Sequence, residues 1–191
     1  MSLGRKQENI QQSGIGNRVT LGNDNSSNLY IIPAKGKLAT LFERLKDKFD
    51  NKEEISKISE DLKRYTDLQD VIGLEKKLED ANMQHYVDDF LWYKQEFNKK
   101  LILYQNYEPA QEIFSYILAI VLERYRNIIK PMIINGASES EILLTISNAI
   151  VTPLLDLVQQ EGCNDIMGLS ATEINGMFHY LTGQCHIKWK L

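Results

Sequence analysis

Hydrophobic side chains recur every three or four positions from residue 38 onward, which is the spacing of one face of an α-helix. The first stripe consists of Leu38, Leu41, Phe42, Leu45 and Phe49. A second stripe follows the capping pattern of Asn51 with Glu54 and consists of Ile55, Ile58, Leu62 and Tyr65. Leu74 and Leu78 indicate a third helix, either short or the start of a longer one. This part of the chain is therefore predicted to be amphipathic helices.

The middle of the chain carries the longest apolar stripe. It predicts one strongly buried helix face and consists of Tyr86, Phe90, Tyr93, Phe97, Leu101 and Tyr104. Pro109 suits the first turn of the next helix, because an N–H at that position has no partner within the helix. Residues 110–122 are apolar nearly all round, which is typical of a helix at the centre of a bundle.

Two serine and glutamate pairs, three residues apart, mark the starts of the last two helices: Ser138 with Glu141, and Ser170 with Glu173. The first pair precedes the core positions Ile142, Ile146, Ile150, Leu154 and Leu157. Pro153 lies inside this helix and should kink it, because proline removes a hydrogen bond and crowds the preceding turn.

The C-terminal end combines a short helix with an extended tail. Ile174, Met177, Phe178 and Leu181 form the apolar face of the helix, for which Gly183 is the expected end. Beyond it, Cys185, Ile187 and Trp189 alternate with polar residues as in a strand. The fold class predicted is mainly α: a bundle of six to seven helices with a short C-terminal strand-like segment.

Residues 1–28 differ from the rest because Gln, Asn, Ser and Gly dominate, so no core can form there. The pattern G-x-[G/D]-N occurs twice, and its glycines and asparagines favour tight β-turns. Because an isolated β-hairpin is marginally stable in water, an ordered tail would need further strands from other copies or from partner chains. The alternative is a disordered tail. We expect an assembly tail and linker over residues 1–34 and a helical interaction domain over residues 35–191. The candidate assembly residues are Gly14, Gly16, Asn17, Gly22, Asp24 and Asn25.

Charge and composition restrict the function further. Lys and Arg total 22 against 26 Asp and Glu, a formal net charge of −4, which disfavours general binding of nucleic acid or anionic membranes. No Lys or Arg occurs between residues 131 and 187. The cysteines form no CxxC and the N-terminus is polar, so a cytoplasmic location is expected. The longest apolar run, residues 113–122, is about half as long as a membrane span requires.

Reactive side chains gather only around His179, Cys185 and His186. Zinc normally has four ligands, and a nucleophile needs a base with an orienting group, so this set of three is incomplete. Cys163 could be a fourth zinc ligand only if the fold brought it to the other three. Packing by a buried cysteine and a hydrogen-bonded histidine is the favoured interpretation. The sequence contains no phosphate-binding glycine loop and no hydrolase motif. We therefore expect no catalytic residue, no metal and no cofactor.

The residues from Gly176 to Trp189, which read GMFHYLTGQCHIKW, together with the G-x-[G/D]-N tail, resemble the C-terminal modules of bacterial ABC-three component conflict systems. In such systems, to which Lamassu-type defence is related, a helical module accompanies an ABC or SMC-like ATPase and a small middle component. The module is often fused to an effector such as a nuclease, whereas we expect no effector domain in this sequence. The resemblance implies defence against phages or plasmids, and marks Gly183, Cys185, His186 and Trp189 as a structural C-terminal motif.

The function predicted from these features is that of a non-enzymatic interaction and oligomerisation subunit of a defence complex. Its expected partners are further copies of itself and the ABC/SMC-like ATPase and effector subunits. The alternative is a small DNA-binding regulator of a defence or mobile-element operon, which would need a basic face on the folded surface. An enzyme that uses the region of Cys185 and His186 is the third possibility.

Overall fold

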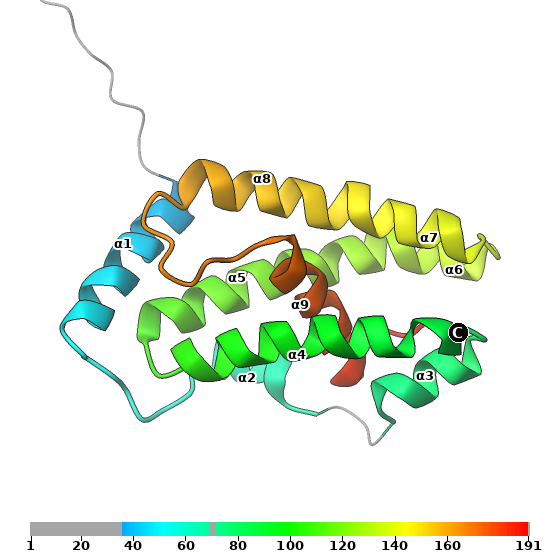
Figure 1. The fold of residues 1–191 in the computed structure, drawn as a ribbon, viewed down its shortest axis with the longest axis horizontal. Coiled ribbons are helices and arrows are strands. Elements are labelled where there is room, and N and C mark those ends of the chain that lie inside the picture. The colour runs from blue at the N-terminus through cyan, green and yellow to red at the C-terminus, as the bar shows by residue number, and fades with distance from the viewer. Residues whose placement is uncertain (1–35, 69–71, 191) are drawn as a thin grey trace, which may run out of the picture. The chain divides into compact units, whose positions relative to one another are not determined.

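The computed structural model describes residues 36–68 and 72–190 (Figure 1). The G-x-[G/D]-N repeats, with all six candidate assembly residues from Gly14 to Asn25, lie outside the described residues. The described elements are α1 (Lys37–Asp50), α2 (Glu60–Thr66), α3 (Leu74–Asp80), η1 (Gln84–Tyr86), α4 (Val87–Tyr104), α5 (Glu108–Arg124), η2 (Tyr125–Ile129), α6 (Lys130–Ile134), α7 (Glu139–Ile146), η3 (Ser147–Val151), α8 (Thr152–Glu161) and α9 (Ala171–Gly183).

Two pairs of these helices are joined without a break by the π-helical segments η2 and η3. When each continuous run is counted once, the described residues contain seven helices and no strand. The prediction of a mainly α fold with six to seven helices is confirmed.

Both serine capping boxes form as predicted. The Ser138 amide donates to the Glu141 carboxylate at 2.8 Å, and the Ser170 amide donates to the Glu173 carboxylate at 2.9 Å. In each case the serine side chain accepts a hydrogen bond from an amide in the first turn of the helix, so two amides that lack intrahelical partners are satisfied together.

The predicted helix start at Asn51 with Glu54 is wrong. Asn51 is the C-terminal cap of α1, and α2 begins only after Ser59, whose hydroxyl accepts a hydrogen bond from the Leu62 amide at 3.2 Å. Lys52 ends α1 because its φ of 56° reverses the chain, which places Ile55 in an exposed loop.

Four helix ends in the described chain share one geometry. In each, a residue with positive φ follows the cap residue, and two backbone amides bond back to the last turn of the helix. This is the Schellman motif, in which glycine is usual because positive φ strains other residues. The residues with positive φ are Lys52 after α1, Asn82 after α3, Gly136 after α6 and Cys185 after α9.

Pro131 and Pro153 are accommodated by π-helical segments that end two residues before each proline. A π-turn bonds residue i to residue i+5, which relieves the crowding of the proline ring against the preceding turn. Pro153 also leaves the Ala149 carbonyl without its usual intrahelical donor. Arg124 on α5 replaces that donor, since its Nη1 bonds to the Ala149 oxygen at 2.5 Å.

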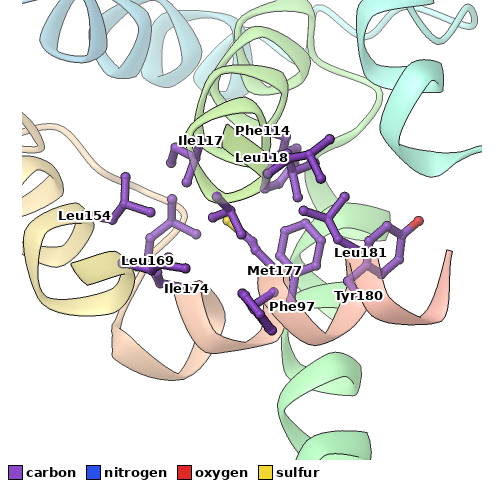
Figure 2. Packing of buried hydrophobic residues seen from close by; sticks show 14 of the residues in the cluster. Phe97, Phe114, Ile117, Leu118, Leu154, Leu169, Ile174, Met177, Tyr180 and Leu181 are labelled. Carbon is purple, nitrogen blue, oxygen red and sulfur yellow. The ribbon is translucent and has the colours of Figure 1, made fainter. Parts of the chain in front are cut away.

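The core of residues 36–190 surrounds α9, which lies between α4 and α5 in Figure 1. Ten of its 13 residues are buried, whereas the sequence predicted burial of only one apolar face of a short helix. Figure 2 shows Ile174, Met177 and Leu181 of α9 pointing toward side chains of α4 and α5. The prediction that residues 110–122 lie centrally agrees with the complete burial of Phe114 and Leu118.

Gly176 allows α9 to approach α4 closely. A Cβ atom at this position would lie 2.3 Å from the Tyr93 carbonyl oxygen and 2.6 Å from the Phe97 Cβ. Both distances are far below van der Waals contact, so any side chain here would force the two helices apart.

The continuous run Glu139–Glu161 is long and apolar enough, by length and composition, to cross a membrane. It contains no long unbroken apolar run, because Ser, Thr and Asn interrupt it. In the structure the apolar positions Ile142, Ile146 and Leu154 lie in the core. Its exposed positions are mostly polar and include Ser140, Asn148, Thr152, Asp156 and Gln159. The buried positions thus form one apolar face against the core, whereas Leu144 is 62% exposed.

Candidate functional site

The C-terminal motif begins where α9 ends at Gly183, as predicted. The left-handed residue of this helix end is Cys185 rather than a glycine, with a φ of 68°. The amide of Cys185 bonds to the Thr182 carbonyl, and that of His186 bonds to the Leu181 carbonyl. The Cys185 thiol donates to the carbonyl of Ile72 at 3.1 Å, so it links the end of α9 to the start of α3.

The segment after Cys185 is not a strand, which corrects the strand-like prediction. The predicted alternation is nevertheless present, since Ile187 and Trp189 are buried while Lys188 and Lys190 are exposed. A side chain takes the place of a pairing strand: the Tyr125 hydroxyl donates to the Lys188 carbonyl at 2.9 Å and accepts from the Lys188 amide at 3.0 Å. Tyr125 thereby fixes the segment against α5 and η2.

His179 lies inside an aromatic cluster. Its ring stacks on Phe90 at a centroid distance of 3.8 Å, and Trp189 lies parallel to it at 6.3 Å. The side chain is 2% exposed, and burial lowers the pKa of His179 to about 3. Its Nδ1 atom has no hydrogen-bond partner among the described residues, so the ring lacks the orienting group that a general base requires.

His186 is oriented by backbone instead of by a second reactive side chain. Burial lowers its pKa, a hydrogen bond with the Tyr65 backbone opposes the shift, and the charges of Arg126 and Lys77 add to it. No cluster of three His, Cys, Asp or Glu side chains suited to a metal ion occurs within residues 36–68 and 72–190. The contacts described for these residues are ring stacking for His179 and backbone hydrogen bonds for Cys185 and His186.

A groove runs beside the C-terminal segment. It consists of two adjoining cavities of about 590 and 530 Å³, which share Asp80, Trp189 and Lys190. The first is also lined by Ile72, Lys77, Cys185 and Lys188, and the second by Ala81, Asn82, Ile133 and Ile134. We call these two cavities together the C-terminal groove. Its walls come from α3, α6 and the residues after α9, which are distant in sequence.

The groove is basic. Lys77, Lys188 and Lys190 line it, whereas the carboxylate of Asp80 lies 3.1 Å from the ammonium group of Lys76 on the same helix. Lys77 donates a hydrogen bond to the Thr182 carbonyl at the end of α9, a neutral group that leaves its charge in place. Sequence reasoning missed this groove, although the lack of Lys and Arg between residues 131 and 187 makes Lys188 and Lys190 conspicuous.

Two carboxylates in residues 131–187, the segment without Lys or Arg, have structural roles that the sequence did not reveal. The Asp165 carboxylate accepts hydrogen bonds from three backbone amides between residues 167 and 169. Glu161 accepts from the Leu38 and Ala39 amides and so caps the N-terminus of α1 from the end of α8. A helix N-terminus attracts negative charge, so the Glu161 carboxylate stabilises this end of α1. The contact also joins two elements that are far apart in sequence.

The fold and the groove define a small all-α module whose C-terminal motif is used for packing. Residues 73–189 match the family model of C-terminal domain 9 of the ABC-three component (ABC-3C) systems. Because this match covers more than half of the 191 residues, the chain belongs to that family, which confirms the resemblance seen in its last residues. No curated protein and no solved structure matches the chain significantly.

Proposed function

We propose that the chain is a non-enzymatic interaction and oligomerisation subunit of a bacterial defence complex that acts against phages or plasmids. In this role it binds an ABC/SMC-like ATPase and associated effector subunits in the cytoplasm. Membership of a multi-component system implies partner subunits, and the finer assignment is our proposal.

The observation that carries the proposal is the use of the C-terminal motif. Trp189 is 6% exposed and His179 is buried with it, while Cys185 and His186 bond to backbone groups. A reactive centre needs accessible groups in mutual hydrogen-bond reach. A motif devoted to packing instead specifies a stable surface, which is what a subunit of a complex requires.

The exposed surface of α4 supports a role in protein contacts. Trp92 and Leu103 are half-exposed, and Leu103 follows Trp92 by eleven positions, or about three helical turns, which places them on the same side of the helix. Ile102 beside them is 60% exposed. Large apolar side chains that share one side of a helix commonly mark interaction surfaces.

An activity assay tests the non-enzymatic part of the proposal. The purified full-length chain is expected to show no nuclease, nucleotidase or hydrolase turnover. Cys185→Ala and His186→Ala variants are measured beside it to separate intrinsic activity from contamination. Steady turnover that disappears in either variant contradicts the proposal.

Deletion of residues 1–28 tests the predicted role of the tail in assembly. The deletion should leave helical circular dichroism and cooperative melting unchanged, because the core lies within residues 36–190. It should lower the mass measured by light scattering. Replacing Gly14 and Gly22 by Val is the milder variant, since β-branched residues disfavour positive φ. Unchanged mass and partner binding in both variants would make the tail a passive segment.

A further inference from the structure

The C-terminal groove concentrates positive charge in a chain that is acidic overall. Lys188 and Lys190 are the only Lys or Arg residues after position 130, and both are exposed. Within the described part of the chain, neither forms an ion pair. Together with Lys77 they give the groove an excess of positive charge, which attracts acidic partners and accelerates their association.

The groove also has apolar walls that remain in contact with water. Ile72 lines one cavity and is 43% exposed, whereas Ile134 lines the other and is 63% exposed. Trp189 lies between them, since it lines both cavities. A ligand that carries only charge would leave these isoleucines exposed, so the complementary ligand has aliphatic side chains as well as carboxylates.

We propose that the C-terminal groove binds an acidic segment of a partner subunit, with Asp and Glu side chains opposite the three lysines and aliphatic side chains over the two isoleucines. This inference rests on the proposed function, because it assigns the face through which the chain contacts its complex. Single-stranded nucleic acid fits less well, since it binds on exposed aromatic rings and Trp189 is almost fully buried.

A binding titration with a defined probe tests the groove. The probe is a short fluorescein-labelled synthetic peptide with glutamate and leucine on opposite faces of a helix, titrated with the full-length chain at low salt. Saturable binding that weakens as salt is added is expected. The K188E/K190E variant should bind about tenfold more weakly or worse, because two attractions become two repulsions.

The control is the K46E/K99E variant, which changes the net charge equally. Lys46 on α1 pairs with Asp50, and Lys99 on α4 pairs with Glu96, so both lie outside the groove. At about 0.1 M salt this variant should bind within about twofold of the wild type, since surface charges farther apart than the Debye length of about 10 Å are screened. Ile134→Ser should weaken binding while leaving its salt dependence unchanged, because it removes apolar contact and no charge.

Several results would overturn the inference. They are the absence of saturable peptide binding, equal weakening by the groove and control variants, and equally tight binding of a peptide with lysine in place of glutamate. Binding of a single-stranded oligonucleotide or of anionic vesicles in preference to the acidic peptide would likewise assign the groove to a different ligand.

Purification of the assembled system separates this inference from the proposed function. If K188E/K190E loses the partner subunits while K46E/K99E retains them, the groove is the docking face. If both variants retain the partners, the groove inference fails and the proposed function stands. If the wild-type chain itself retains none, the proposed function fails, and the peptide titration alone decides the chemistry of the groove.

Discussion

Alanine substitution of the two glycines of α9, Gly176 and Gly183, should have opposite effects on stability. In Gly176→Ala the new Cβ would lie 2.3 Å from the Tyr93 carbonyl oxygen, where ordinary contact begins near 3.4 Å. Both that oxygen and the neighbouring Phe97 Cβ belong to rigid parts of α4, so they cannot rotate away. The two helices must instead separate within the core.

The magnitude follows from two competing effects. Replacing glycine by alanine inside a helix gains about 1 kcal/mol of helix propensity. Overpacking of a tightly packed core costs about 1–3 kcal/mol and sometimes more, and the backbone clash here places Gly176→Ala at or above the upper end. A net loss of about 2 kcal/mol in the free energy of unfolding is therefore expected.

Gly183→Ala is the matched control, because it makes the same substitution in the same helix. Its Cβ would meet only the Lys94 side chain, with Nζ at 2.9 Å, and this flexible chain can move away at little cost. The free energy of unfolding should be unchanged or rise by up to about 1 kcal/mol. Urea denaturation of both variants, followed by circular dichroism, measures the difference. If Gly176→Ala is as stable as Gly183→Ala, the close packing of α9 on α4 is refuted.

Three further variants probe the rest of the fold. Leu154→Ala should lose about 2–5 kcal/mol because the side chain is fully buried, and a loss within about 0.5 kcal/mol would place it at the surface. Gln111→Leu should lose about 2–4 kcal/mol, since the buried amide bonds to the Ser59 amide and the Lys57 carbonyl, whereas Glu112→Gln beside it should be neutral by the same urea assay. His179 takes up a proton below about pH 6.5 in the unfolded state but only near pH 3 in the folded state. As the pH is lowered from 6.5 to 3, the free energy of unfolding should therefore fall by about 1.4 kcal/mol per pH unit. A His179→Phe variant with the same acid dependence would rule out this residue as its cause.

The parts of the fold that the sequence predicted correctly are those fixed by local interactions. Ser138 and Ser170 begin helices through contacts with glutamates three residues away, and these contacts need no information from the rest of the chain. The same holds for the apolar stripes, because a helix buries one face wherever the core lies. The predicted helix start at Asn51 was wrong because Asn51 instead caps the end of α1, where Lys52 takes a positive φ.

The candidate site could be predicted only in part. The end of α9 at Gly183 was expected, but glycine preference alone did not point to Cys185 as the left-handed residue. Gln111 was missed because its partners lie in a distant loop. The C-terminal groove was missed for the same reason, since its walls come from three separate parts of the chain.

If the chain acts by binding other subunits, the mass of the assembly that it forms must exceed its own. The tagged full-length chain would be co-expressed with the genes that neighbour its own, purified, and measured by size-exclusion chromatography with light scattering. We expect one complex that contains the ATPase subunit and more than one copy of this chain. Elution of the chain alone, with the 22.0 kDa mass of a single copy, would contradict it.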